Sequence, residues 1–141
     1  MFTIAHLHPM LVHFPIALVA TGFLLELVFL FVKKEVCLTR AGFYLLILGT
    51  LAAIVTWLSG FFFTSEMEGA AEQVRDTHEL FATITMVLLI IASVFRIMAL
   101  KKSNSKQLKK IAFVMYGLAM LSVSVTGFYG GTLVFNYMMP L

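Results

Sequence analysis

Four long apolar runs, separated by short polar connections, divide the chain. They cover about residues 9–32, 41–63, 79–100 and 111–137. Each run reaches the length at which a helix crosses a bilayer, which is about 20 residues. The pattern therefore predicts an all-α membrane protein in which residues 1–141 form one domain, a four-transmembrane-helix bundle.

The composition agrees with this prediction and narrows the range of partners. Hydrophobic residues make up 61% of the chain and charged residues only 12%, and the mean hydropathy is +1.00. A soluble domain of this size cannot bury so much apolar surface, so we expect a lipid bilayer around the helices. The net charge of +3 comes from bases beside the apolar runs. Bases in that place set topology and meet lipid headgroups, so no nucleic-acid partner is expected.

The distribution of the bases predicts the orientation in the membrane. Positive residues concentrate in the connections after the first and third runs, and such connections stay in the cytoplasm. We therefore expect a multi-pass protein of the bacterial cytoplasmic membrane with its N- and C-termini outside. The bases concerned are Lys33, Lys34, Arg40, Lys101, Lys102, Lys106, Lys109 and Lys110.

All four histidines then belong to the outer side of the membrane. His6, His8 and His13 stand where the first run begins, and His78 stands where the third begins. His13 lies four residues beyond Pro9, which is about 6 Å deeper along a helix. An imidazole in hydrocarbon is costly without a partner, so these rings are candidates for a bound group.

The two halves of the chain share a pattern that pairs His13 with His78. His13 precedes Gly60 by 47 positions, and His78 precedes Gly127 by 49, with a basic connection between the two runs of each half. The halves thus look like one helical hairpin used twice, related by a pseudo-two-fold axis along the membrane normal. The alternative is a chance alignment, since small residues beside aromatic ones are common in membrane helices.

Two imidazoles that face each other beside glycines could bind a haem b through two histidine ligands. The glycines let a flat ring lie against bare backbone, and aromatic residues supply its walls. We therefore predict a small cytochrome b-like protein that transfers single electrons to a quinone or an external redox protein. The site consists of His13 and His78 as ligands, Gly60, Gly127, Gly130 and Gly131 beside the ring, and Phe14 in the wall.

Two other interpretations remain open. His8 caps the first helix, or it joins His13 and His78 in a copper or zinc site without porphyrin. Alternatively, the chain is a structural or assembly subunit whose histidines only bond backbone carbonyls. No nucleophile with a base at a recognisable spacing and no phosphate-binding loop occurs, so an electron carrier fits better than a catalyst.

Two further features concern the helices themselves. Glu26 and Arg96 both fall within the inner half of the bilayer, where we expect an ion pair across the bundle or an Arg96 that reaches the lipid headgroups. The alternative for Glu26 is a carboxylate on a proton path. Small residues along the fourth run let a second helix approach closely, which makes a homodimer a further expectation. These residues are Gly117, Gly127 and Gly131.

The opening stretch at 8–15, His-Pro-Met-Leu-Val-His-Phe-Pro, carries a resemblance to a known family. Together with His78 and the pair Gly130 and Gly131, it resembles a widespread bacterial family of small predicted membrane proteins of unknown function. Members of that family look like four-helix proteins, and some are fused to Rieske-type or cytochrome-like domains. The resemblance implies work near an electron-transfer chain but names no reaction.

Overall fold

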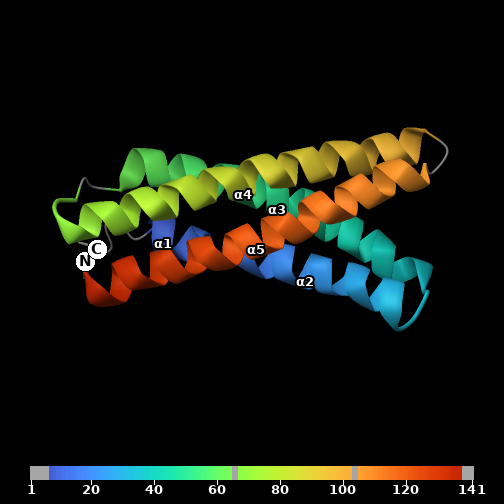
Figure 1. Ribbon diagram of the computed structural model, residues 1–141, viewed down its shortest axis with the longest axis horizontal. Coiled ribbons are helices and arrows are strands. Elements are labelled where there is room, and N and C mark those ends of the chain that lie inside the picture. Colours follow the sequence, from blue (N-terminus) through green and yellow to red (C-terminus); the bar gives the residue numbers. More distant parts are fainter. Residues whose placement is uncertain (1–6, 65–66, 103–104, 138–141) are drawn as a thin grey trace.

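The computed structural model describes residues 7–64, 67–102 and 105–137, and nearly all of them are helical (Figure 1). Four segments are long and apolar enough to cross a membrane, the first of them made of two helices in succession. The predicted all-α membrane class is therefore confirmed. The helices are α1 (Leu7–Leu11), α2 (His13–Phe31), α3 (Val36–Phe63), α4 (Ala70–Lys101) and α5 (Lys106–Asn136).

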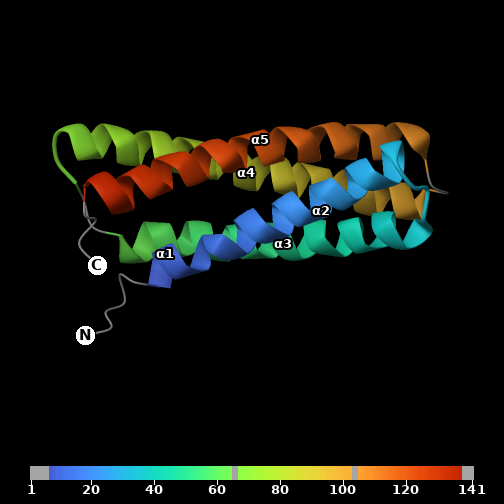
Figure 2. The ribbon, with the colours of Figure 1, turned by 90° about the horizontal axis from the view of Figure 1, so that it is seen from below.

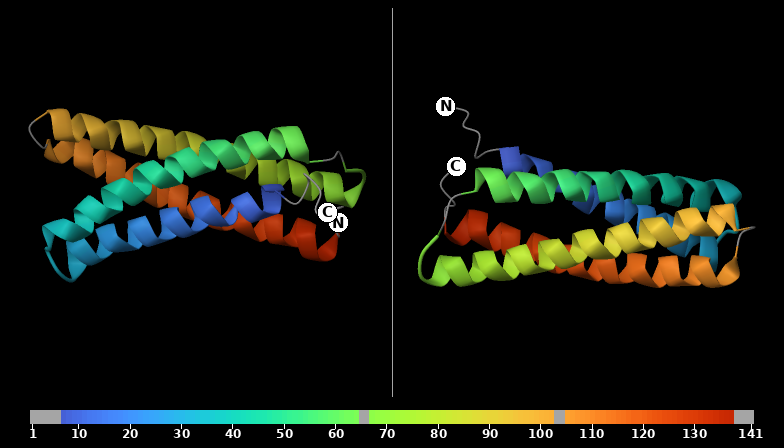
Figure 3. Two further views of the ribbon diagram at one scale, coloured as in Figure 1. Left: turned by 180° about the vertical axis from the view of Figure 1, so that it is seen from behind. Right: turned by 90° about the horizontal axis from the view of Figure 1, so that it is seen from above.

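The helices form two antiparallel hairpins, α2 with α3 and α4 with α5. Seen from below, the hairpins lie in two layers (Figure 2), and they cross each other at a shallow angle (Figure 3). The start of α1, the end of α3, the start of α4 and the end of α5 lie together at one end of the bundle. We call this the terminal end. The opposite end, where Lys101 and Lys106 flank a connection, is called the basic end.

Buried positions repeat along the chain at a constant spacing of 70 residues. Val19 and Leu89 are both fully buried at the centre of the bundle, and each lies in the first helix of its hairpin. This spacing supports the predicted pseudo-two-fold relation between the hairpins, in a register different from the expected one. The buried pairs are Pro15 with Thr85, Val19 with Leu89, Gly22 with Ala92, Gly42 with Ala112, Leu46 with Tyr116, Gly49 with Ala119 and Ala53 with Val123.

A proline causes the break between α1 and α2. Pro15 has no amide hydrogen, so the carbonyl of Leu11 cannot receive the usual helical bond from it. The hydroxyl of Thr56 on α3 donates to that carbonyl instead, at 3.3 Å. The short helix α1 therefore lies against α3, and its residue His8 turns into the bundle with only 8% of its surface exposed.

Helix α4 begins nine residues before the predicted third span. Gly69 precedes it with a φ of 67°, a conformation that glycine adopts without strain and that ends the preceding connection. At 32 residues α4 is about 48 Å long, well beyond the hydrocarbon thickness of about 30 Å. Its polar first turns, with Glu72 and Asp76, therefore extend past the apolar part of the bundle.

Hydroxyl groups join the two hairpins near the middle of the bundle. Thr50 on α3 and Ser93 on α4 are hydrogen-bonded at 2.8 Å, and the indole of Trp57 donates to the hydroxyl of Thr83 at 2.9 Å. In an apolar environment such bonds help to fix one helix against another. These bonds hold α3 against α4 between the terminal end and the basic end of the bundle.

Candidate functional site

Two imidazoles face each other at the terminal end of the bundle. His8 on α1 and His78 on α4 have ring centroids 6.3 Å apart, and their ring planes are nearly perpendicular at 89°. His78 lies 70 positions after His8, so the two residues occupy equivalent places in the two hairpins. The structure thus brings together His8 and His78, whereas the sequence predicted His13 opposite His78.

Hydrogen bonds fix the same tautomer in both rings. The Nδ1–H of His78 donates to the carbonyl of Thr126 at 2.9 Å. Nδ1 of His8 lies 2.9 Å from the hydroxyl oxygen of Ser59, and that hydroxyl donates its own hydrogen to the carbonyl of Thr56 at 2.7 Å. Ser59 must therefore accept from His8, so Nε2 keeps a lone pair in both neutral rings.

The second half of the chain repeats this arrangement of carbonyls. Thr126 lies 70 positions after Thr56, so each imidazole is tied to the same carbonyl of its hairpin, directly for His78 and through Ser59 for His8. Such a bond to Nδ1 is the usual means by which proteins orient a histidine whose Nε2 binds a metal. In both rings Nε2 is therefore the nitrogen that carries the lone pair.

Two glycines make room for the two rings. A Cβ added at Gly60 would lie 3.0 Å from Cε1 of His8, and one at Gly130 would lie 3.1 Å from Cε1 of His78. These glycines are again 70 positions apart. Gly60 and Gly130 therefore lie against the two imidazoles, and the place of a haem ring beside the glycines stays a prediction.

We expect Gly130→Ala to be less stable than Gly131→Ala, because the new methyl group at 130 forces the ring of His78 to shift. Gly131→Ala is the matched control, since nothing lies within 4 Å of its Cβ position. The two variants gain the same helix propensity, so their difference isolates the crowding, about 1–3 kcal/mol. Thermal unfolding in detergent measures it. Equal melting temperatures for the two variants would contradict this packing.

Among the described residues, the other predicted site residues make no contact of this kind with the two imidazoles. His13 is exposed, and its Nδ1–H donates to the carbonyl of Pro9 at 2.8 Å. Phe14 is 62% exposed, and a Cβ at Gly127 meets only Ile16, at 3.6 Å, among the described residues. His6 lies outside the described residues.

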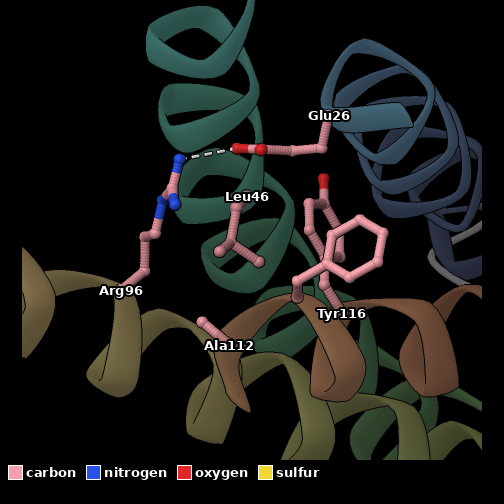
Figure 4. A pocket seen from close by; sticks show the side chains of 6 residues that line it. Glu26, Leu46, Arg96, Ala112 and Tyr116 are labelled. Carbon is pink, nitrogen blue, oxygen red and sulfur yellow. Dashed lines mark hydrogen bonds and ion pairs between the residues drawn. The ribbon is translucent and has the colours of Figure 1, made fainter. Parts of the chain in front are cut away.

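An ion pair occupies the equivalent positions near the basic end. Arg96 on α4 donates from Nη2 to Oε1 of Glu26 on α2 at 2.8 Å, and both side chains are nearly buried (Figure 4). The hydroxyl of Thr39 donates to the same carboxylate at 3.1 and 3.2 Å. The predicted pair across the bundle is confirmed, and its members again lie 70 positions apart.

The hydroxyl of Tyr116 points toward Glu26 from α5 (Figure 4). It is buried and has no hydrogen-bond partner among the described residues. A cavity of about 10 Å³ adjoins it, lined also by Glu26, Leu46 and Arg96. This volume is close to what one water molecule needs.

The sequence predicted for His8 a helix cap, a contact to a haem propionate, a role in orienting a ligand, or a place as third ligand, but not a place as one of two facing ligands. The signal that could have identified it is the constant spacing of 70 that relates His8 to His78, Gly60 to Gly130 and Glu26 to Arg96. The expected register instead used spacings of 65 and 67.

Comparison with known proteins yields one family. A family model described as a predicted membrane protein (DUF2231) matches residues 5–140. No curated protein and no solved structure matches the chain. The match to the family model covers nearly the whole sequence.

Proposed function

We propose that this chain, which belongs to the DUF2231 family of predicted membrane proteins, is a small haem-binding protein that transfers single electrons. His8 and His78 are the proposed axial ligands of a haem b. The observation that carries the proposal is a pair of imidazoles from the two hairpins whose ring centroids lie 6.3 Å apart, each with its Nδ1 hydrogen-bonded.

The distance between the rings supports coordination on opposite sides of one metal. A nitrogen binds such a metal at about 2.0–2.1 Å and the ring centre lies about 1 Å further out, so two opposed rings have centres about 6 Å apart. Rings on adjacent corners of a tetrahedron would have centres only about 5 Å apart. The observed separation of 6.3 Å between the ring centroids is closer to the first value than to the second.

The set of donors also favours haem over a bare metal ion. Across residues 7–64, 67–102 and 105–137, no group of three or more His, Cys, Asp or Glu side chains is placed to hold a metal. A protein-bound zinc ion takes at least three ligands from the chain. Haem needs only two axial ligands, because the porphyrin supplies the remaining four.

The residues around the rings have clear roles in this proposal. Haem iron, when bound, supplies one-electron chemistry. Ser59 and the carbonyl of Thr126 hold the two imidazoles in the tautomer that presents Nε2, while Gly60 and Gly130 let the rings pack against α3 and α5. Hydrogen bonds to the ligand and burial in an apolar bundle are means by which a protein tunes such a cofactor.

The topology supplies the proposed location. With the bases at the cytoplasmic surface, the termini and both histidines lie near the outer face of a bacterial cytoplasmic membrane. The proposed electron partner is therefore a quinone or a redox protein that approaches from outside.

Absorption spectroscopy tests the proposal. The full chain, expressed with sufficient haem supply and purified in detergent, should show a Soret band and reduced α bands. A pyridine haemochrome assay should give about one haem b per chain, the capacity of one ligand pair. Bound copper or zinc without a Soret band would replace haem by a metal-ion site. Absence of both would overturn the proposal and leave a structural or assembly role.

A further inference from the structure

A second cavity lies at the basic end, beyond the ion pair of Glu26 and Arg96. Its volume is about 330 Å³, and all four long helices contribute to its lining. Two kinds of side chain stand out in this lining. Aromatic rings come from Phe29 and Phe113, and cations come from Arg96, Lys106, Lys109 and Lys110.

The cavity carries an excess of positive charge. Glu26 is its one acidic lining residue, and that carboxylate already pairs with Arg96. Among the described residues, the ion pairs are Arg96 with Glu26 and Lys33 with Glu35, so the three lining lysines have no acidic partner there. Three uncompensated cations around one cavity favour an anionic ligand.

Arg96 offers donors that its present partners do not use. Its bonds to Glu26 and Thr39 all start from Nη2, and Nε and Nη1 have no bond to a described residue. A guanidinium has five N–H donors in a rigid plane that suits phosphate oxygens. Glu26 and Thr39 therefore hold a preorganised anion-binding group at the base of the cavity.

We propose that this cavity binds the phosphate headgroup of an acidic phospholipid. Arg96 donates to the phosphate oxygens at the base, and Lys106, Lys109 and Lys110 surround the headgroup. Phe29 and Phe113 give the acyl chains an apolar wall, which a free phosphate ion would not need. Basic pockets between membrane helices, near the helix ends, are the usual places for such headgroups.

Lipid retention by the full chain tests this site. The protein is purified in mixed micelles that contain equal amounts of phosphatidylglycerol and phosphatidylcholine, and native mass spectrometry counts the lipids that remain bound. We expect preferential retention of phosphatidylglycerol and a higher melting temperature when it is added. The double variant Lys106→Gln/Lys110→Gln should weaken this retention at least about tenfold. Both lysines are exposed, so the variant should fold.

The control is Lys33→Gln/Lys34→Gln, which removes two charges from the same end of the bundle that do not line the cavity, one of them the partner of Glu35. It should retain phosphatidylglycerol like the wild type. Equal losses in the two double variants would mean general surface attraction and overturn the site. Equal retention of the two lipids by the wild type would also overturn it. If millimolar sodium phosphate stabilises the wild type as strongly as phosphatidylglycerol does, the ligand is a free anion and the lipid proposal fails.

Discussion

His8→Ala and His78→Ala should each purify without the Soret band, whereas His13→Ala should keep the wild-type absorbance. The rings of His8 and His78 lie with their centroids 6.3 Å apart, and the Nδ1 atom of each ring is hydrogen-bonded to its own hairpin. His13 is exposed and engaged with the carbonyl of Pro9. With one of two axial ligands removed, haem occupancy should fall below about a tenth of the wild-type value. Absorbance at the Soret maximum, normalised to protein concentration, measures this.

His13 is a demanding control because it has the same side chain and lies only five residues from His8. Circular dichroism and gel filtration of all three variants show whether the bundle is intact. A variant that is folded and lacks haem has lost a ligand. If His13→Ala loses the band while His8→Ala keeps it, the ligand pair is the one that the sequence pattern suggested.

The difference between His8 and His13 shows where sequence reasoning stopped. On an uninterrupted helix, residues five positions apart diverge by roughly 140°, so only one of them can face the bundle. Whether His8 or His13 faces the bundle depends on how the first helical turns lie against α3. Two bonds hold these turns on α3: Thr56 donates to the Leu11 carbonyl that Pro15 leaves free, and His8 bonds Ser59. Thr56 lies 45 residues away, and the local sequence gives no sign of this contact.

The fold could be predicted from the hydropathy pattern and the positions of the basic residues. Four apolar runs of spanning length and two basic connections predict four helices in two hairpins, because backbone groups in lipid must be satisfied within each helix. The partner of Arg96 was also predictable, since a charge inside the bilayer requires a counter-charge. The start of α4 was not, because the polar turns after Gly69 extend beyond the apolar run by which the span was recognised.

The repeat of the two hairpins explains both the wrong choice of His13 as the ring that faces His78 and the correct pairing of Glu26 with Arg96. The expected alignment matched histidine, basic connection and glycine as types of residue, and it accepted slightly different spacings for each. The structure relates the halves by one constant spacing, and this spacing puts opposite charges, Glu26 and Arg96, at equivalent positions. A repeat of strict length is therefore better evidence of register than a repeat of similar motifs.

Glu26→Gln should be the most destabilising single change at the basic end, costing about 3–5 kcal/mol in the free energy of unfolding. The carboxylate of Glu26 is the counter-charge of the nearly buried Arg96 guanidinium, with Nη2 and Oε1 2.8 Å apart. The amide of glutamine carries no charge, so Arg96 would stay nearly buried without a counter-charge. Reversible unfolding in detergent with increasing SDS measures the loss. Glu35→Gln is the control. It removes an exposed pair with Lys33 at 3.5 Å, and it should cost no more than about 0.5 kcal/mol.

The exchange Glu26→Arg/Arg96→Glu tests both the ion pair and the pseudo-symmetry. Since the two positions are equivalent in the two hairpins, exchanging the residues rebuilds the pair from the opposite sides of the axis. The double variant should recover more than half of the stability that Glu26→Gln loses. Recovery should be incomplete, because the hydroxyl of Thr39 donates to the carboxylate at position 26 and the corresponding position of the second hairpin, Lys109, has no hydroxyl. If the double variant loses as much free energy of unfolding as the two single variants together, the sites are not coupled. That result would contradict the symmetric placement.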